Sequence, residues 1–133
     1  MSNVAKGYTF PKKEKLKGKK SFEVLFSEGK VLKAYPIQLR YLPMDFSDGA
    51  HIKVAVVAPK RRFKKAVQRN RIKRLLREAY RLNKSLVFNN IEGNFALLFL
   101  YLGNTMPTLA EVEATVQQLL QDFIKQQLHE KHS

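Results

Sequence analysis

The middle of the chain carries the two-residue period of β-strands. From residue 37 to residue 42, just after Pro36, apolar and more polar side chains alternate, which predicts a strand with one buried face. Residues 30–35 read as a separate edge strand, because a proline disfavours continuation through its predecessor. Residues 52–58 are predicted to form a further strand. The run FALLFLYL, residues 95–102, is apolar throughout and predicts a central strand covered on both faces.

Three other segments follow the period of a helix. Phe22, Leu25 and Phe26 recur at i, i+3 and i+4, so residues 19–28 are predicted to form a short helix that ends at Gly29. By pattern alone, the two phenylalanines are core residues more readily than surface residues that stack on bases.

The last helix begins at a capping box. Thr108 is followed three positions later by Glu111, the spacing with which each side chain can bond the other residue's backbone. We expect the helix to last to about residue 128 and residues 129–133 to fray. One face of it is apolar: Leu109, Val112, Val116, Leu119, Leu120, Phe123 and Ile124.

The middle helix is predicted over residues 65–82, before a loop that contains Asn89, Asn90 and Gly93. At 100° per residue its apolar side chains fall on one stripe that would face the sheet. The stripe comprises Ile72, Leu75, Leu76, Ala79 and Leu82.

Composition bounds the class of protein. A chain of 133 residues fits one domain with its own core, so residues 1–133 are taken as a single domain in which residues 1–18 form a mobile basic arm anchored by apolar residues such as Leu16. There is no cysteine, hence no disulfide and no thiolate chemistry. No apolar run is long enough to cross a bilayer, so we expect a cytoplasmic protein with no membrane partner.

Charge adds the strongest functional signal. The chain has 25 basic and 11 acidic residues, a net charge of +14, and residues 60–81 alone carry +10 of it with a single acid, Glu78. On the predicted helix most of these cations lie away from the apolar stripe, and many are like-charged neighbours at i, i+3 or i+4, which is unfavourable unless an anion binds. Arginine prevails over lysine there, as suits bidentate contacts with phosphate. RNA is therefore the leading partner.

Other readings share some of these features. A ribosomal or general RNA-binding module would have the charge and the arginine helix without an aromatic groove. A DNA-binding protein would need a helix that enters the major groove, and no helix-turn-helix partner is evident. A basic membrane-surface helix fits least, because the apolar stripe already has a sheet to cover.

The same residues carry a resemblance. The run AVQRNRIKRLLRE, residues 66–78, resembles the "RNR" signature of the bacterial ribonuclease P protein subunit. The upstream VAPKR, residues 57–61, resembles the end of the family's cleft strand. Leu16, Phe22 and Phe26 match its N-terminal leucine and paired aromatics.

The resemblance implies an α/β fold, an α+β two-layer sandwich with a mostly antiparallel sheet and packed helices. It also implies a left-handed βαβ crossover, against the general rule that such crossovers are right-handed in about 98% of cases.

The implied function is that of an accessory subunit. In the family, a catalytic RNA uses Mg²⁺ to remove the 5′ leader of precursor tRNA, and the protein binds both RNAs, one protein per RNA, without a small-molecule substrate. The resemblance assigns catalytic-RNA contacts to Arg69, Asn70, Arg71, Lys73, Arg74 and Arg77. It assigns a leader-binding cleft to Phe22, Phe26, Arg40, Lys60, Arg61 and Ala66.

Arg40 departs from the pattern, since some relatives have an aromatic residue there. Pro59 and Arg62 replace residues that are often small and polar. The chain offers no Gly-rich phosphate loop, clustered carboxylates or nucleophile motif, so we expect no catalytic residue, no metal site and no cofactor on the protein itself.

Overall fold

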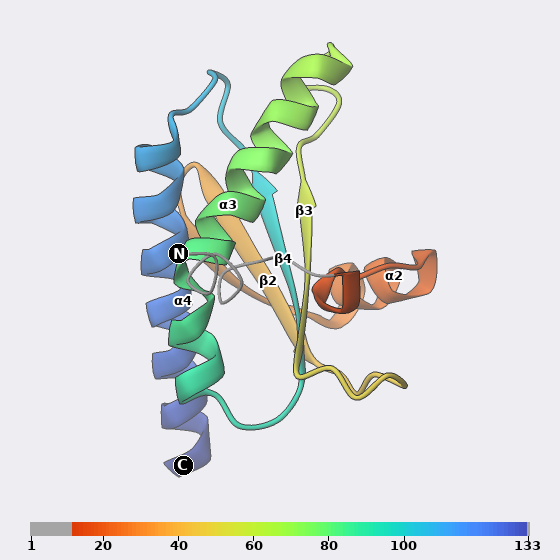
Figure 1. The fold of residues 1–133 in the computed structure, drawn as a ribbon, viewed down its shortest axis with the longest axis vertical. Coiled ribbons are helices and arrows are strands. Elements are labelled where there is room, and N and C mark those ends of the chain that lie inside the picture. Colours follow the sequence, from red (N-terminus) through yellow and green to blue (C-terminus); the bar gives the residue numbers. More distant parts are fainter. Residues whose placement is uncertain (1–11, 133) are drawn as a thin grey trace, which may run out of the picture.

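A computed structural model describes residues 12–132. Its elements are a 3₁₀ helix η1 (Lys12–Glu14), α2 (Lys19–Glu28), β1 (Lys30–Ala34), β2 (Ile37–Pro43), β3 (Ile52–Val57), α3 (Ala66–Asn90), β4 (Phe95–Tyr101) and α4 (Leu109–His132). Each predicted strand and helix is present, and the predicted bounds of α2 are those observed (Figure 1).

The four strands form one mixed sheet in the order β1-β2-β4-β3. β1 pairs antiparallel with β2 and β2 antiparallel with β4, whereas β3 runs parallel to β4. The sheet is therefore mostly antiparallel, as expected, but its edge strand β3 pairs parallel with β4. β4 lies in the interior of the sheet with nearly all of its side chains buried, which confirms the prediction from its continuous apolar run.

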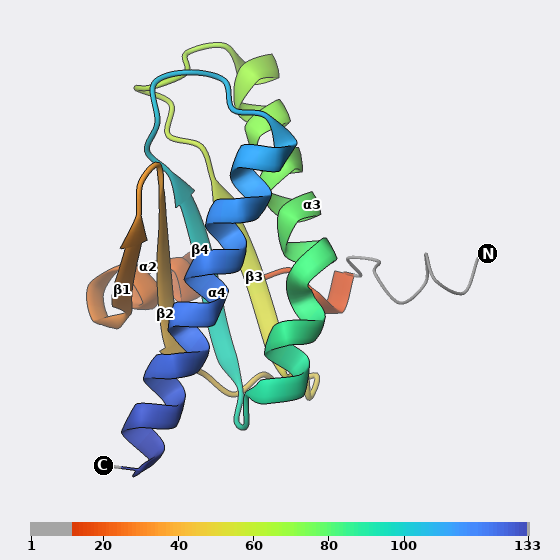
Figure 2. The ribbon, with the colours of Figure 1, turned by 90° about the vertical axis from the view of Figure 1, so that its left-hand side faces the viewer.

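The parallel pair requires a crossover, and α3 supplies it. In Figure 1 both strands run upward, α3 crosses in front of the sheet, and β4 lies to the left of β3. Figure 2 shows α3 and α4 together on that side of the sheet. This arrangement is a left-handed crossover, as the resemblance implied.

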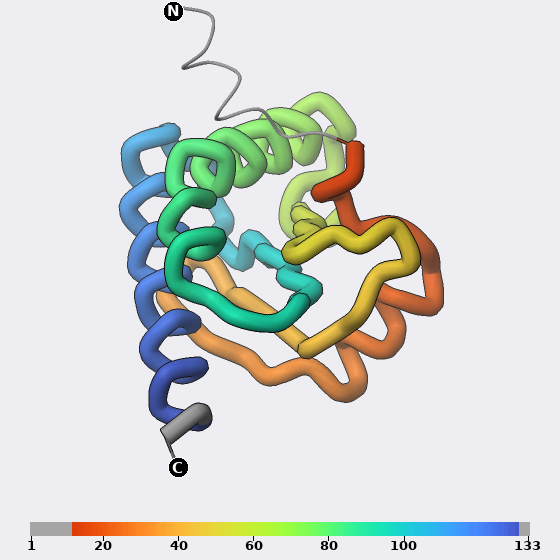
Figure 3. Tube along the Cα trace, turned by 60° about the horizontal axis from the view of Figure 1, so that its bottom comes forward, coloured from red at the N-terminus to blue at the C-terminus, as the bar shows by residue number. Residues whose placement is uncertain are grey.

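Helices cover the two faces unequally. α3 and α4 pack on one face over the larger hydrophobic core, which includes Leu39, Leu97, Phe99 and Phe123. α2 packs on the other face over a smaller cluster of Leu16, Leu25, Ala55, Ala96 and Leu98. Figure 3 shows the strands between α4 on one side and α2 on the other.

Two predictions about α3 were wrong. The helix does not end near residue 82 but continues through Asn89 to Asn90, and Leu82 is 36% exposed instead of completing the buried stripe. The extension escaped detection because polar residues occupy buried positions there. Asn83 donates to the carbonyl of Ala79 at 2.8 Å, which satisfies its amide inside the helix.

The last helix is also longer than predicted. α4 continues to His132, past the expected end near residue 128 and through part of the segment expected to fray. Its start is as predicted: Glu111 accepts from the Thr108 N–H at 2.9 Å, and the Thr108 hydroxyl accepts from the Glu111 N–H at 3.2 Å.

Candidate nucleic-acid interface

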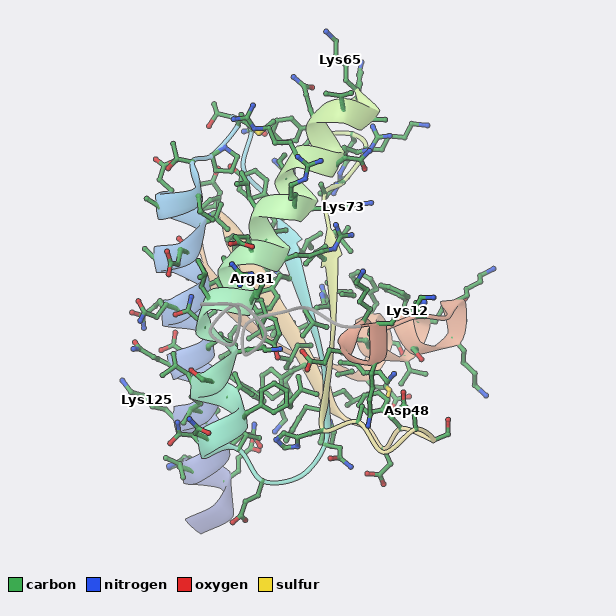
Figure 4. All side chains as sticks on the ribbon, viewed as in Figure 1. Lys12, Asp48, Lys65, Lys73, Arg81 and Lys125 are labelled. Atoms are coloured by element: carbon green, nitrogen blue, oxygen red, sulfur yellow. The ribbon has the colours of Figure 1, made fainter. Side chains whose placement is uncertain are left out.

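The first half of α3 presents most of the predicted RNA contacts to solvent. Figure 4 shows the basic side chains Lys65, Lys73 and Arg81 succeeding one another along the helix. The side chains divide by exposure: Asn70, Arg71, Arg74 and Arg77 are exposed, whereas Arg69 and Lys73 are partly buried. The amphipathic pattern explains this division, because Ile72, Leu76 and Ala79 are fully buried against the core.

Arg81 is engaged within the protein. Its Nε donates to Glu78 Oε1 at 2.9 Å, one turn away on the same helix. The hydrogen bonds from Arg81 lower the pKa of Glu78 below its usual range, so Glu78 stays ionised and offsets the charge of Arg81. The free cationic surface of α3 therefore lies in its N-terminal part.

The Arg69 side chain contacts backbone carbonyls of the loop that precedes α3. One of its guanidinium nitrogens, Nη1, lies 2.8 Å from the carbonyl oxygen of Phe63 and 2.7 Å from that of Lys64. These carbonyls belong to the loop that leads into α3. The structure thus separates Arg69 from Asn70 and Arg71, which the sequence grouped with it.

The turn between β3 and α3 holds the next predicted residues. Lys60 and Arg61 are exposed, and so is Ala66, the first residue of α3. Phe63 anchors the turn because its ring is buried and lies 6.1 Å from that of Tyr101. Arg62 ties the turn to the loop that follows β4, since its Nη1 donates to Asn104 Oδ1 at 2.9 Å.

Phe26 and Arg40 form a second small site. Phe26, on α2, is 42% exposed, and the guanidinium of Arg40 lies 4.9 Å from the centre of its ring. Arg40 also donates to the carbonyl of Phe26 at 3.2 Å and to the Gln38 side chain at 3.1 Å. An exposed ring beside a held cation is a surface on which a base can stack while a phosphate is neutralised.

Phe22 belongs to a third place. It is partly buried on the smaller core cluster and lines a cavity of about 190 Å³ that also contains Arg77 of α3. An aromatic predicted for the leader cleft and an arginine predicted for the catalytic RNA therefore meet in one hollow. The other walls are Lys15, Leu16, Lys17, Val54, Ala55 and Val56.

Lys15 and Lys17 were missed as site residues. The segment before α2 runs along the free edge of β3, where the Leu16 N–H donates to the Val54 carbonyl at 2.9 Å. Lys84 adds a contact to Glu14 at 3.1 Å. The signal was present in the sequence, since buried Leu16 stands between two lysines in a basic arm. Residues 1–11 of that arm lie outside the described residues.

The predicted cleft residues thus fall into three groups: Phe22 with Arg77, Phe26 with Arg40, and the turn with Lys60, Arg61 and Ala66. No helix within residues 12–132 is long and apolar enough to span a membrane.

Comparison with known proteins decides the family. The family model "Ribonuclease P" matches residues 10–124, nearly the whole chain. The chain belongs to the ribonuclease P protein family. It is 34% identical over 112 residues to the ribonuclease P protein component of Porphyromonas gingivalis, covering 82% of each chain. It is 31% identical over 130 residues to that of Chlorobaculum tepidum, covering 89% of this chain and 84% of the relative.

Solved structures agree at the level of the fold. The ribonuclease P protein of Staphylococcus aureus superposes with a TM-score of 0.65 at 16% identity, over 81% of this chain and 93% of the other. That of Thermotoga maritima gives 0.64 at 24% identity, over 80% and 94%. Membership makes the chain a protein component of ribonuclease P, an endoribonuclease of tRNA processing, and implies ribonuclease P RNA as its partner.

Proposed function

We propose that this protein assists the removal of the 5′ leader from precursor tRNA by binding the catalytic RNA with one surface and the leader with another. The first surface lies on α3. It comprises the exposed residues Asn70, Arg71, Arg74 and Arg77 and the partly buried Lys73. The second comprises Phe22, Phe26, Arg40 and the turn with Lys60, Arg61 and Ala66. The two surfaces adjoin at the cavity that Phe22 and Arg77 both line. The proposal rests on family membership and on the side chains that each surface presents.

The single observation that carries the proposal is that each of the two aromatic side chains of α2, Phe22 and Phe26, shares a surface site with an arginine. Phe26 stands beside Arg40, and Phe22 shares a cavity with Arg77. Aromatic rings stack on any base and cations follow any phosphate backbone, so such a surface accepts single strands of varied sequence. A 5′ leader is a strand of this kind.

In this proposal the chemistry is carried by the RNA subunit, with one protein per RNA. In this proposal the RNA also holds the Mg²⁺ that the reaction needs. The role of the protein is electrostatic and positional: it neutralises phosphates and holds the leader. We place the complex in the cytoplasm, where bacterial precursor tRNA is made.

A reconstitution tests the function. Cleavage of precursor tRNA by a bacterial ribonuclease P RNA is measured at low Mg²⁺ with and without the protein, using precursors with a leader of several nucleotides or of one. We expect higher affinity and rate with the protein, and a larger gain for the longer leader. No gain for either substrate would refute the proposal, and an equal gain for both would leave a general RNA-binding protein.

A further inference from the structure

The loop of residues 59–65 carries two of the predicted leader contacts but has little secondary structure of its own. It contains a turn in which the Arg62 and Phe63 N–H groups both bond the Pro59 carbonyl, at 3.2 and 3.3 Å. Lys60 and Arg61 are exposed on it. An exposed basic turn presents its charges in one direction only if something fixes the turn against the body of the protein.

Three contacts fix this loop, and one of them comes from the RNR motif. Phe63 is buried, and Arg62 bonds Asn104. Arg69 reaches back from the first turns of α3 so that its Nη1 atom lies within hydrogen-bond distance of two successive carbonyls, Phe63 O and Lys64 O. These carbonyls lie just before the helix, where Lys65 at the N-cap position makes no side-chain capping bond.

The position of Arg69 on the helix explains the contact. At 100° per residue it lies about 60° from Ile72, on the side of α3 that faces the protein, whereas Asn70 and Arg74 lie on the opposite side. Its side chain is accordingly partly buried, unlike those of Asn70 and Arg71. A guanidinium has rigidly placed donors and can bond two acceptors at once, which a lysine ammonium on a flexible stem does less well.

We propose that Arg69 is a positioning residue: it bonds the Phe63 and Lys64 carbonyls to hold the turn that presents Lys60 and Arg61 to RNA, and it is not itself the principal RNA contact. The first arginine of the motif then serves the leader side of the protein, while Asn70, Arg71 and Arg74 serve the catalytic-RNA side. The role of Lys60 and Arg61 in this inference rests on the proposed function. That Arg69 holds the loop in place does not depend on it.

The first test uses the free protein. Amide hydrogen exchange of residues 60–65, above all of the Arg62 and Phe63 N–H groups that bond the Pro59 carbonyl, is compared among the wild type, Arg69→Lys and Arg69→Gln. Arg71→Lys and Arg71→Gln, two positions along the helix, are the matched controls. Loss of a charge-assisted contact should speed exchange of the loop about ten-fold or more in both Arg69 variants. The Arg71 variants should leave it unchanged. Unchanged exchange in the Arg69 variants would overturn the inference even if the protein stimulates cleavage.

The second test measures affinity for precursor tRNA in the reconstituted complex. Arg69→Lys should weaken affinity for precursor tRNA nearly as much as Arg69→Gln. For the direct contact at Arg71, affinity for the catalytic RNA is measured instead, and Arg71→Lys should retain most of the affinity that Arg71→Gln loses. In a chain that already carries Lys60→Ala and Arg61→Ala, Arg69→Gln should add less than a two-fold further loss, because the residues it positions are gone. Full additivity, or rescue by lysine at position 69, would show a direct RNA contact and overturn the proposal. A wild-type protein without effect on cleavage would instead refute the proposed function, and the exchange result would stand.

Discussion

Arginines along α3 differ in what their guanidinium groups contact. Arg69 bonds backbone carbonyls, Arg81 bonds Glu78, and Arg74 is exposed. Each of the three adds one positive charge, so a count of net charge does not distinguish them. The energy available for RNA binding differs among them, because a guanidinium that already has a protein partner must give it up or share it.

The phenylalanines of α2 also differ from their neighbour in the sequence. Leu25 is fully buried, whereas Phe26 is 42% exposed and Phe22 is intermediate. A leucine buried to this degree costs about 2–5 kcal/mol of stability when cut to alanine. The Phe26 ring stays accessible to solvent in the folded protein, so a ligand can reach it.

We predict that Phe26→Ala weakens precursor tRNA binding relative to mature tRNA by about 1–3 kcal/mol, the usual range for one base stacked on an aromatic ring. Phe22→Ala should act in the same direction but also lower stability, since its ring packs on the smaller core cluster. Binding of the two tRNAs and chemical denaturation would be measured together. Leu128→Ala, at a 49% exposed apolar residue of α4, is the matched control. Equal discrimination in Phe26→Ala and wild type would remove this ring from the leader site.

At the scale of the element, the placement of α2 decides where both rings stand. The helix ends at Gly29, whose N–H donates to the Leu25 carbonyl at 2.9 Å. A Cβ at this position would lie 2.4 Å from that carbonyl oxygen and 3.3 Å from the Tyr41 carbonyl oxygen on β2. Both are backbone atoms, so neither can move aside without a shift of the helix or the strand.

Gly29→Ala should therefore destabilise the protein by about 1–3 kcal/mol, the range for overpacking, and displace α2 relative to β2. Thermal or denaturant unfolding measures the first effect. The second should appear as weaker discrimination of precursor from mature tRNA at a temperature where the variant is folded. Glu28→Ala, an exposed change one residue earlier, should alter neither quantity. A Gly29→Ala protein with wild-type stability would show that the close approach is relieved at no cost.

α3 shows where an element can be read from sequence and where it cannot. Its first half has a regular apolar stripe, and that half was predicted. In its second half Asn83 and Lys84 are buried and satisfied by hydrogen bonds, to the Ala79 carbonyl and to Glu14. Polar residues at buried positions erase the period on which the prediction depended. The partner of Lys84 is 70 residues away, and only the folded chain brings it there.

At the scale of the whole molecule, the fold sets cations from separate segments around one sheet edge. Lys15 and Lys17 from the N-terminal segment share a cavity with Arg77 of α3. Electrostatic binding of this kind depends on the total number of phosphates neutralised, since each releases counterions. Helix α3 and the segment before α2 therefore contribute together to the salt-dependent part of the binding free energy.

We predict that affinity for ribonuclease P RNA falls steeply with salt, with a log–log slope of roughly −4 to −5 if six phosphates are neutralised. Arg74→Ala and Arg77→Ala should each reduce the magnitude of the slope by about one. Arg81→Ala is the control and should change it less, because Glu78 already offsets its charge. Affinity measured from low to moderate salt gives the slopes. A slope that stays the same in Arg74→Ala and Arg77→Ala would place these residues away from the RNA.

The sequence by itself determined which elements form, their order and the covered central strand. It also determined that the middle helix has an apolar stripe on one side and most of its basic residues away from that stripe. All of these follow from local periodicity and charge. Its RNR motif also indicated the family. The tertiary structure decided which cations are free: Arg69 turns to its own loop, Arg81 to Glu78, and Arg77 to a cavity with Phe22. The partners of Arg69 and Arg81 are only three to six residues away, but which of them each side chain bonds is set by packing in three dimensions. The cavity of Arg77 and Phe22 joins segments far apart in the sequence and depends on how α2 and α3 are placed around β3. Neither property is encoded in the period of a single element.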